Sequence, residues 1–321
     1  MRVITQPNAK LWQVRSDRQV FSSVFTEESP VAGPALSFTE LVPDFHHYMG
    51  SFGGRVFPLW SNAEATQPNL RGPLLAHLSK AFERAVGAED LFGYIAAVAA
   101  HPAYIERFRN DLATPGLRIP LTADADTFFE AAALGRRIVW LHTFGERFAD
   151  ATVGREPGAP QLAVGRRPQV PKGGAIPTTT EGMPDTLAYD TDKQRLQVGS
   201  GYIEPVPPAV WHYQVSGKKV LVQWFSYRKK HRERPIISDR RKPSELGDIQ
   251  PDHWLAEYTT ELLNVLNVLS LLVELEPQAA ALLGRICAGP LVTKAELQVA
   301  GAFFPEGFVS ATAPAQSSLD L

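Results

Sequence analysis

The chain has 321 residues, of which 44% are hydrophobic and 21% are charged, as in ordinary globular proteins with one large or two smaller domains. Its formal net charge of −2 at pH 7 gives no overall excess of one sign. The single cysteine, Cys287, excludes a disulfide within the chain and a zinc cluster built from cysteines. The N-terminal sequence has no secretory apolar segment, and no stretch reaches about eighteen uninterrupted apolar residues. We therefore expect a cytoplasmic protein without a membrane partner.

The first 72 residues are expected to form an N-terminal β-rich segment. Apolar and β-branched residues gather there in short runs that are separated by Pro and Gly, a pattern typical of short strands. The runs are Val20–Glu28, Pro34–Pro43 and Gly54–Trp60.

Residues 73–150 are predicted to be helical, because apolar residues recur there at helical spacing. His101–Pro102 interrupts the pattern, since the residue before a proline avoids helical geometry. Thr122 or Asp124 is a candidate cap for the last helix. The expected helices cover Leu74–Val86, Ala88–Ala100, Ala103–Leu112 and a segment that ends at His142.

Residues 151–250 are expected to form a loop and β-rich basic segment. Ala151–Met183 is rich in Pro, Gly and basic residues and has little apolar periodicity, which favours a long irregular loop. A hairpin should follow, with strands at Thr186–Tyr189 and Gln194–Val198 and a turn at Asp190–Lys193. Tyr202–Val206 could add an edge strand.

Two short helices are expected next, and longer ones after residue 250. Val210–Tyr213 favours a helix or turn, and Lys219–Tyr227 favours a helix, although VLVQWF within it also suits a strand. Residues 251–321 should contain the C-terminal helices and a frayed tail. A long helix is predicted at Asp252–Glu274 with Asp252 as its cap, and a shorter helix from Pro277 to about Cys287. The fold class is therefore mixed α+β: a helical centre flanked by small β-sheet elements, with a long C-terminal helix.

The densest positive charge of the chain lies in Val210–Lys242. Ten Lys or Arg face only Glu233 and Asp239, an excess of eight, so the remainder of the chain carries −10. Such local charge commonly meets a polyanion, although a solvated helix end or loop would show the same composition. The candidate DNA-binding cations are Lys218, Lys219, Arg228, Lys229, Lys230, Arg232, Arg234, Arg240, Arg241 and Lys242. Weaker candidates for base contact are Gln223, Arg166 and Arg167, since Arg pairs with guanine and Gln with adenine.

Part of this segment resembles a known family. Val210–Tyr213, Val215, Gly217, Val220–Leu221, Trp224 and Arg228–Lys230 resemble the signature VW-x-Y-x-V-x-G-x-x-V-L-x-x-W-x-x-x-R-K of the C-terminal specificity domain of Type ISP restriction-modification enzymes. Those enzymes join helicase-nuclease, adenine methyltransferase and target-recognition parts in one polypeptide. Three more stretches agree in the same order: Pro43–Trp60, Leu91–Thr122 and Phe128–His142.

The resemblance implies a target-recognition module that binds double-stranded DNA and positions a methyltransferase and a nuclease. The sequence contains no Asp/Asn-Pro-Pro-Tyr/Phe motif, no Gly-rich cofactor loop and no GxxxxGK[ST] phosphate loop. We therefore expect no catalytic, cofactor or metal residues here, and a separate methyltransferase or helicase-nuclease subunit as a possible partner. His46–His47 beside Asp44 has no metal-binding spacing.

Two other functions stay open at this point. The basic segment could dock an acidic protein, in which case a stoichiometric complex would form without specific DNA binding. The chain could also be a small-molecule enzyme with a pocket between its helical and β-rich halves. Steep salt dependence of binding would favour DNA over either alternative.

Overall fold

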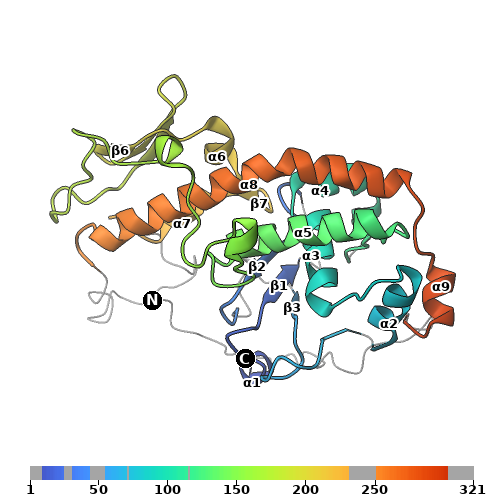
Figure 1. Ribbon diagram of the computed structural model, residues 1–321. Coiled ribbons are helices and arrows are strands. Elements are labelled where there is room, and N and C mark those ends of the chain that lie inside the picture. The colour runs from blue at the N-terminus through green and yellow to red at the C-terminus, as the bar shows by residue number, and fades with distance from the viewer. Residues whose placement is uncertain are drawn as a thin grey trace, which may run out of the picture.

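The computed structural model describes residues 9–24, 31–43, 55–70, 72–114, 116–230 and 251–302. It confirms the mixed α+β class: helices form the centre, and three small antiparallel sheets flank them (Figure 1). A short helix, α1 (Ala9–Gln13), precedes the first sheet and was not predicted.

The first sheet contains the three predicted strands β1 (Phe21–Val24), β2 (Leu36–Thr39) and β3 (Arg55–Pro58) in the order β2-β1-β3. The central strand β1 is buried at every position, since both neighbours cover its edges and the core covers its faces. Phe21 is paired with Thr39 on one side and with Pro58 on the other.

Five helices build the central layer. They are α2 (Gly72–Ala81), α3 (Ala88–Ala99), α4 (Pro102–Phe108), α5 (Ala125–His142) and α8 (Ala256–Ala288). Figure 1 shows α5 and α8 side by side, and α3 packs closely against α5. The Asp124 side chain caps α5 by accepting a hydrogen bond from the Thr127 amide at 2.8 Å, as the sequence predicted.

The predicted loop has only two short 3₁₀ turns, at Ala151–Val153 and Val164–Arg166, and the β-rich part follows it. Strands β4 (Leu187–Asp190), β5 (Arg195–Val198) and β6 (Gly201–Ile203) form a meander in which β6 is an edge, as expected. Figure 1 shows this sheet over the N-terminal half of α8. A two-stranded ribbon, β7 (Gln214–Val215) and β8 (Lys218–Lys219), lies between α6 (Pro208–His212) and α7 (Val220–Ser226).

One hydrophobic core runs through the helices and the sheets. Leu196, Val198 and Ile203 of the second sheet are fully buried and belong to the same cluster as Ile138 of α5 and Leu266 of α8. The β-rich segment is therefore anchored on the helical layer by apolar side chains.

The prediction of two C-terminal helices was wrong, because α8 is one helix of 33 residues with Pro277 inside it. Proline removes one hydrogen bond from a helix, at a cost of about 3 kcal/mol. Burial of Leu272 before Pro277 and of Ala279 and Leu282 after it offsets this cost. The N-cap position is Leu255 rather than Asp252. A further helix, α9 (Lys294–Val299), was not predicted, and the predicted frayed tail lies outside the described residues.

By length and composition, α8 is also the one helix in the described ranges that could cross a membrane. Half of its apolar window is buried inside the protein.

Candidate nucleic-acid interface

Helix α7 lies within the basic stretch Val210–Lys242, and an aromatic cluster holds this helix in place. Trp254 is fully buried and contacts the rings of Trp224 and Phe225 from α7, at centroid distances of 6.1 Å in each case. Tyr258 packs edge-on against Trp254 at 5.4 Å. Trp254, just before α8, together with Tyr258 in the first turn of α8, therefore fixes the orientation of α7.

Arg228 is engaged with this cluster. Its guanidinium lies 4.1 Å from the centre of the Trp224 ring and 5.5 Å from that of Tyr258. One terminal nitrogen donates to Glu261 Oε2 at 2.8 Å, and the other donates to the Trp224 carbonyl at 3.1 Å. Only 25% of the Arg228 side chain is exposed. Through these contacts, Arg228 joins α7 to α8.

Lys229 and Lys230 have a different environment. The Lys230 amide donates to the Pro184 carbonyl at 2.8 Å, which ties the backbone to the loop before β4, and the side chain is exposed. Within the described ranges, its ammonium donates to the Glu181 carbonyl at 3.4 Å. Among the described residues, no acidic side chain pairs with Lys229 or Lys230, so both ammonium groups can meet an external anion.

Three more candidates lie on or beside α7. Lys218 is exposed on β8, and the Lys219 ammonium lies 4.6 Å from the centre of the Trp211 ring. Trp211 is itself stacked on Tyr189 at 5.5 Å, which links this ribbon to the second sheet. Gln223 donates to the Tyr227 hydroxyl at 2.9 Å, one helical turn further along.

The loop candidates Arg166 and Arg167 lie at another part of α8. Arg166 forms an ion pair with Glu274, and Arg167 donates to the Leu162 carbonyl at 2.7 Å. Glu274 follows Glu261 by thirteen residues, roughly 20 Å along the helix. The structure therefore does not bring these arginines together with Arg228. Arg166 and Arg228 each pair with a carboxylate of α8 that is distant in sequence, so the local sequence could not reveal these pairs.

Several sequence candidates lie outside the described residues. They are Arg232, Arg234, Arg240, Arg241, Lys242 and the His46–His47 pair with Asp44. Within the described ranges, no group of three or more His, Cys, Asp or Glu could hold a metal ion.

The histidine in α5 is part of the packing. His142 is half-buried, and its Nδ1 accepts a hydrogen bond from the Phe38 amide at 3.2 Å. Burial lowers the pKa of His142 to about 4, so the ring is neutral at pH 7. His142 thus joins α5 to β2.

Together, the fold and this surface define an α+β domain with exposed lysines at the end of an aromatic-anchored helix. The family model for the Type ISP C-terminal specificity domain matches residues 1–265. The chain therefore belongs to this family, as the signature around Trp211 and Trp224 predicted.

Solved structures agree with the fold. The chain is 18% identical to a protein in "cryoEM structure DrdV-DNA complex", with a TM-score of 0.52 over 84% of this chain and 24% of that chain. It is 14% identical to the protein in "ATP-dependent Type ISP restriction-modification enzyme LlaBIII bound to DNA", with a TM-score of 0.51 over 84% of this chain and 16% of that chain. The chain thus spans less than a quarter of the length of either protein. No curated protein sequence matches it.

Proposed function

We propose that the chain is a DNA target-recognition module of a Type ISP-like modification or restriction system. The observation that carries this proposal is the match of the specificity-domain family model to residues 1–265. Two proteins with a similar fold are described as DNA complexes, which supports double-stranded DNA as the ligand. A cytoplasmic location is part of the same proposal, since DNA and its modification enzymes meet there.

We propose a positioning role for this module, with chemistry supplied by other parts of a larger enzyme. The sequence has none of the motifs with which methyltransferases and motor ATPases bind their cofactors. A methyltransferase or helicase-nuclease, as another part of the same polypeptide or as a separate subunit, would act on the site that this module recognises. Without specific DNA binding, the same surface would serve as a protein-docking face.

Within this proposal, the lysines supply phosphate contacts. Lys229, Lys230 and Lys218 have exposed or half-exposed ammonium groups without carboxylate partners in the described part of the chain, which suits contact with phosphate oxygens. Arg232, Arg234, Arg240, Arg241 and Lys242 would extend the same contact along the chain.

Arginine and glutamine side chains would have other roles. Arg228 would hold the surface in shape through Trp224 and Glu261. Gln223, Arg166 and Arg167 are proposed for base contacts, and Arg166 would have to exchange Glu274 for a guanine edge. Such an exchange is inexpensive, because an exposed ion pair contributes about 0–1 kcal/mol.

The phosphate role can be tested by a matched pair of double variants. Lys229→Ala with Lys230→Ala removes the two cations after α7, whereas Lys10→Ala with Lys80→Ala removes two exposed cations from α1 and α2. If both α7 lysines contact phosphate, the slope of log K against log salt becomes shallower by about 1.8, at about 0.9 per contact. The control pair should keep the wild-type slope.

The outcome that would contradict the assignment is equally clear. Equal slopes for the two double variants would move the phosphate surface away from the end of α7. Weaker binding on all duplexes by the same factor would identify phosphate contacts, and a changed sequence preference would identify base contacts.

A further inference from the structure

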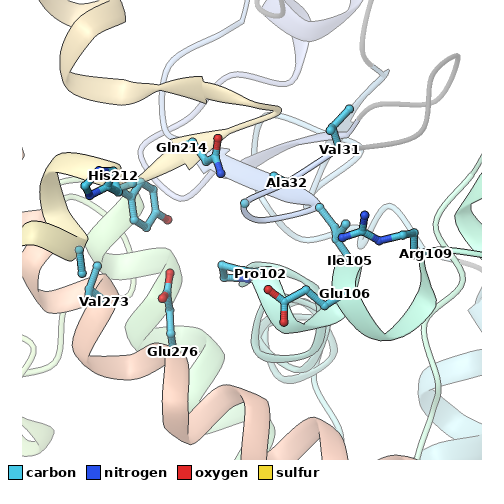
Figure 2. Close-up of a pocket in the computed structure, with 13 residues that line it drawn as sticks. Val31, Ala32, Pro102, Ile105, Glu106, Arg109, His212, Gln214, Val273 and Glu276 are labelled. Carbon is cyan, nitrogen blue, oxygen red and sulfur yellow. The ribbon is translucent and has the colours of Figure 1, made fainter.

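A pocket of about 180 Å³ lies between the helical layer and the β-rich half, away from Lys229 and Lys230. Its walls come from α4, α6, β7 and α8 and from Val31–Gly33, which precedes β2 (Figure 2). This volume is smaller than the roughly 300 Å³ at which pockets for drug-sized ligands begin. The pocket therefore suits a small molecule.

The position of the loop that closes the pocket is fixed by a backbone contact. Gly33 has φ +85°, and a Cβ at this position would lie 2.0 Å from the Gln214 carbonyl oxygen. Only glycine allows this approach, so Val31–Gly33 is held against β7. The pocket is therefore a preformed feature of the fold.

Two carboxyl groups face the space from opposite walls. Figure 2 shows Glu106 of α4 and Glu276 of α8 with their carboxyl groups directed into the pocket. Arg109 lies at another side of it, next to the loop, so the net charge of the lining is negative when both carboxyl groups are ionised. Pro277 cannot donate the usual helix hydrogen bond to the carbonyl of Val273, a further residue of the wall.

Buried polar side chains lie at the inner end of the pocket. Tyr213 is only 8% exposed. Tyr213 and Glu276 also line a small adjoining cavity together with His101. His101 is 2% exposed, and the backbone carbonyls of Ala97 and Val98 next to its ring partly offset the effect of burial on its pKa. The Tyr213 and His101 side chains thus lie together at this end, next to the Glu276 carboxyl, and the pocket suits a polar occupant.

We propose that this pocket binds a small organic amine, whose ammonium group is held between the carboxylates of Glu106 and Glu276. A metal ion fits less well, because no group of three or more potential ligands occurs among the described residues. An alkyl diamine is long enough for its two ammonium groups to reach acceptors on two walls. Ammonium groups only donate hydrogen bonds, and the carboxylates and carbonyls of the pocket accept them. The lining contains none of the residues proposed for DNA contact, and the test of the pocket requires no DNA.

Glu276 gives the proposal a proton signature. Burial, and then the nearby Glu106, raise the pKa of Glu276 to about 7. Its other titratable or charged neighbours are Arg109 at the end of α4, His212 of α6, Tyr213 and His101. A cation that binds the carboxylate displaces the proton, so at pH 7 binding should release about half a proton per ligand. Affinity should accordingly rise about tenfold from pH 6 to pH 8.

The test is isothermal titration calorimetry of the full chain with putrescine, in the absence of DNA. The Glu276→Gln variant should bind at least about tenfold more weakly at pH 8 and lose the pH dependence. Glu257→Gln is the matched control, because Glu257 is an exposed residue on the same helix and lies outside the pocket. Thermal unfolding of each variant, followed by circular dichroism, checks that the fold is intact.

Several outcomes would overturn the proposal. These are the absence of putrescine binding at millimolar concentration, equal affinities of the two variants, and wild-type binding that releases no proton at pH 7. Binding of glutarate in place of putrescine would also overturn it, because Arg109 would then be the anchor and the ligand an anion.

Discussion

The contact between α3 and α5 leaves no room for a methyl group, so Gly135→Ala should destabilise the fold. A Cβ at Gly135 would lie 1.6 Å from the Gly93 carbonyl oxygen and 2.5 Å from its carbonyl carbon. Real Cβ atoms keep about 3.4 Å from such atoms, and a backbone carbonyl in a helix cannot rotate away. The two helices would have to separate by more than about 1 Å, which would loosen the packing of Ile138 and Ala97 at the contact.

The magnitude follows from two opposing effects. Overpacking a core costs about 1–3 kcal/mol and sometimes more, whereas replacing glycine by alanine inside a helix stabilises it by about 0.5–1 kcal/mol. The steric effect is at the upper end here, because the nearest atoms are backbone. We expect Gly135→Ala to lower the free energy of unfolding by about 2 kcal/mol or more.

Gly284 of α8 is the matched control, since a Cβ there would meet no atom within 4 Å. Gly284→Ala should therefore raise the free energy of unfolding by up to about 1 kcal/mol. Urea denaturation of both variants, followed by circular dichroism, measures the difference. If Gly135→Ala were as stable as Gly284→Ala, the close approach of α3 and α5 would be refuted.

Three further predictions concern charged and titratable side chains. Arg228→Ala should lower the free energy of unfolding by about 1–2 kcal/mol, since it removes an ion pair and a cation–π contact. An unchanged urea midpoint would show that Arg228 does not join α7 to α8. Desolvation lowers the pKa values of the buried His101 and the half-buried His142 to about 4. Below about pH 6.5 the unfolded chain therefore takes up protons at these residues while the folded chain does not, and stability should fall from pH 6.5 to pH 5. Equal unfolding free energies at these two pH values would contradict their neutral burial. Because the pKa of Glu276 is raised to about 7 in the folded state, ionisation costs stability as pH rises from about 4.5 to 7. Glu276→Gln should thus be more stable relative to wild type at pH 8 than at pH 4.5, as thermal melts at both values can check.

Local interactions made much of the fold predictable. The turn between β4 and β5 follows from Asp190, whose side chain accepts a hydrogen bond from the Lys193 amide at 3.1 Å. The start of α5 follows from Asp124 in the same way. Both signals lie within three residues of the element that they specify, so the sequence contains them directly.

Tertiary burial decided the features that the sequence did not predict. Pro277 is a local signal for the start of a helix, yet apolar contacts on both sides of it keep α8 continuous. The length of α8 in turn places Glu261 and Glu274 where they pair with Arg228 and Arg166. Such pairs join residues 33 and 108 positions apart, and no local pattern encodes them. The sequence therefore predicted where the basic residues lie. It could not show that Lys229 and Lys230 are available to bind an anion whereas Arg228 joins α7 to α8.

The central claim is that this domain recognises a DNA sequence, and selection from a randomised duplex pool tests it most directly. The purified chain would be incubated with the pool over a salt series near physiological strength, and the retained DNA would be sequenced. We predict enrichment of one short asymmetric motif, together with binding that weakens steeply as salt rises. Retention without enrichment at any salt concentration, or no retention at all, would contradict target recognition by this chain.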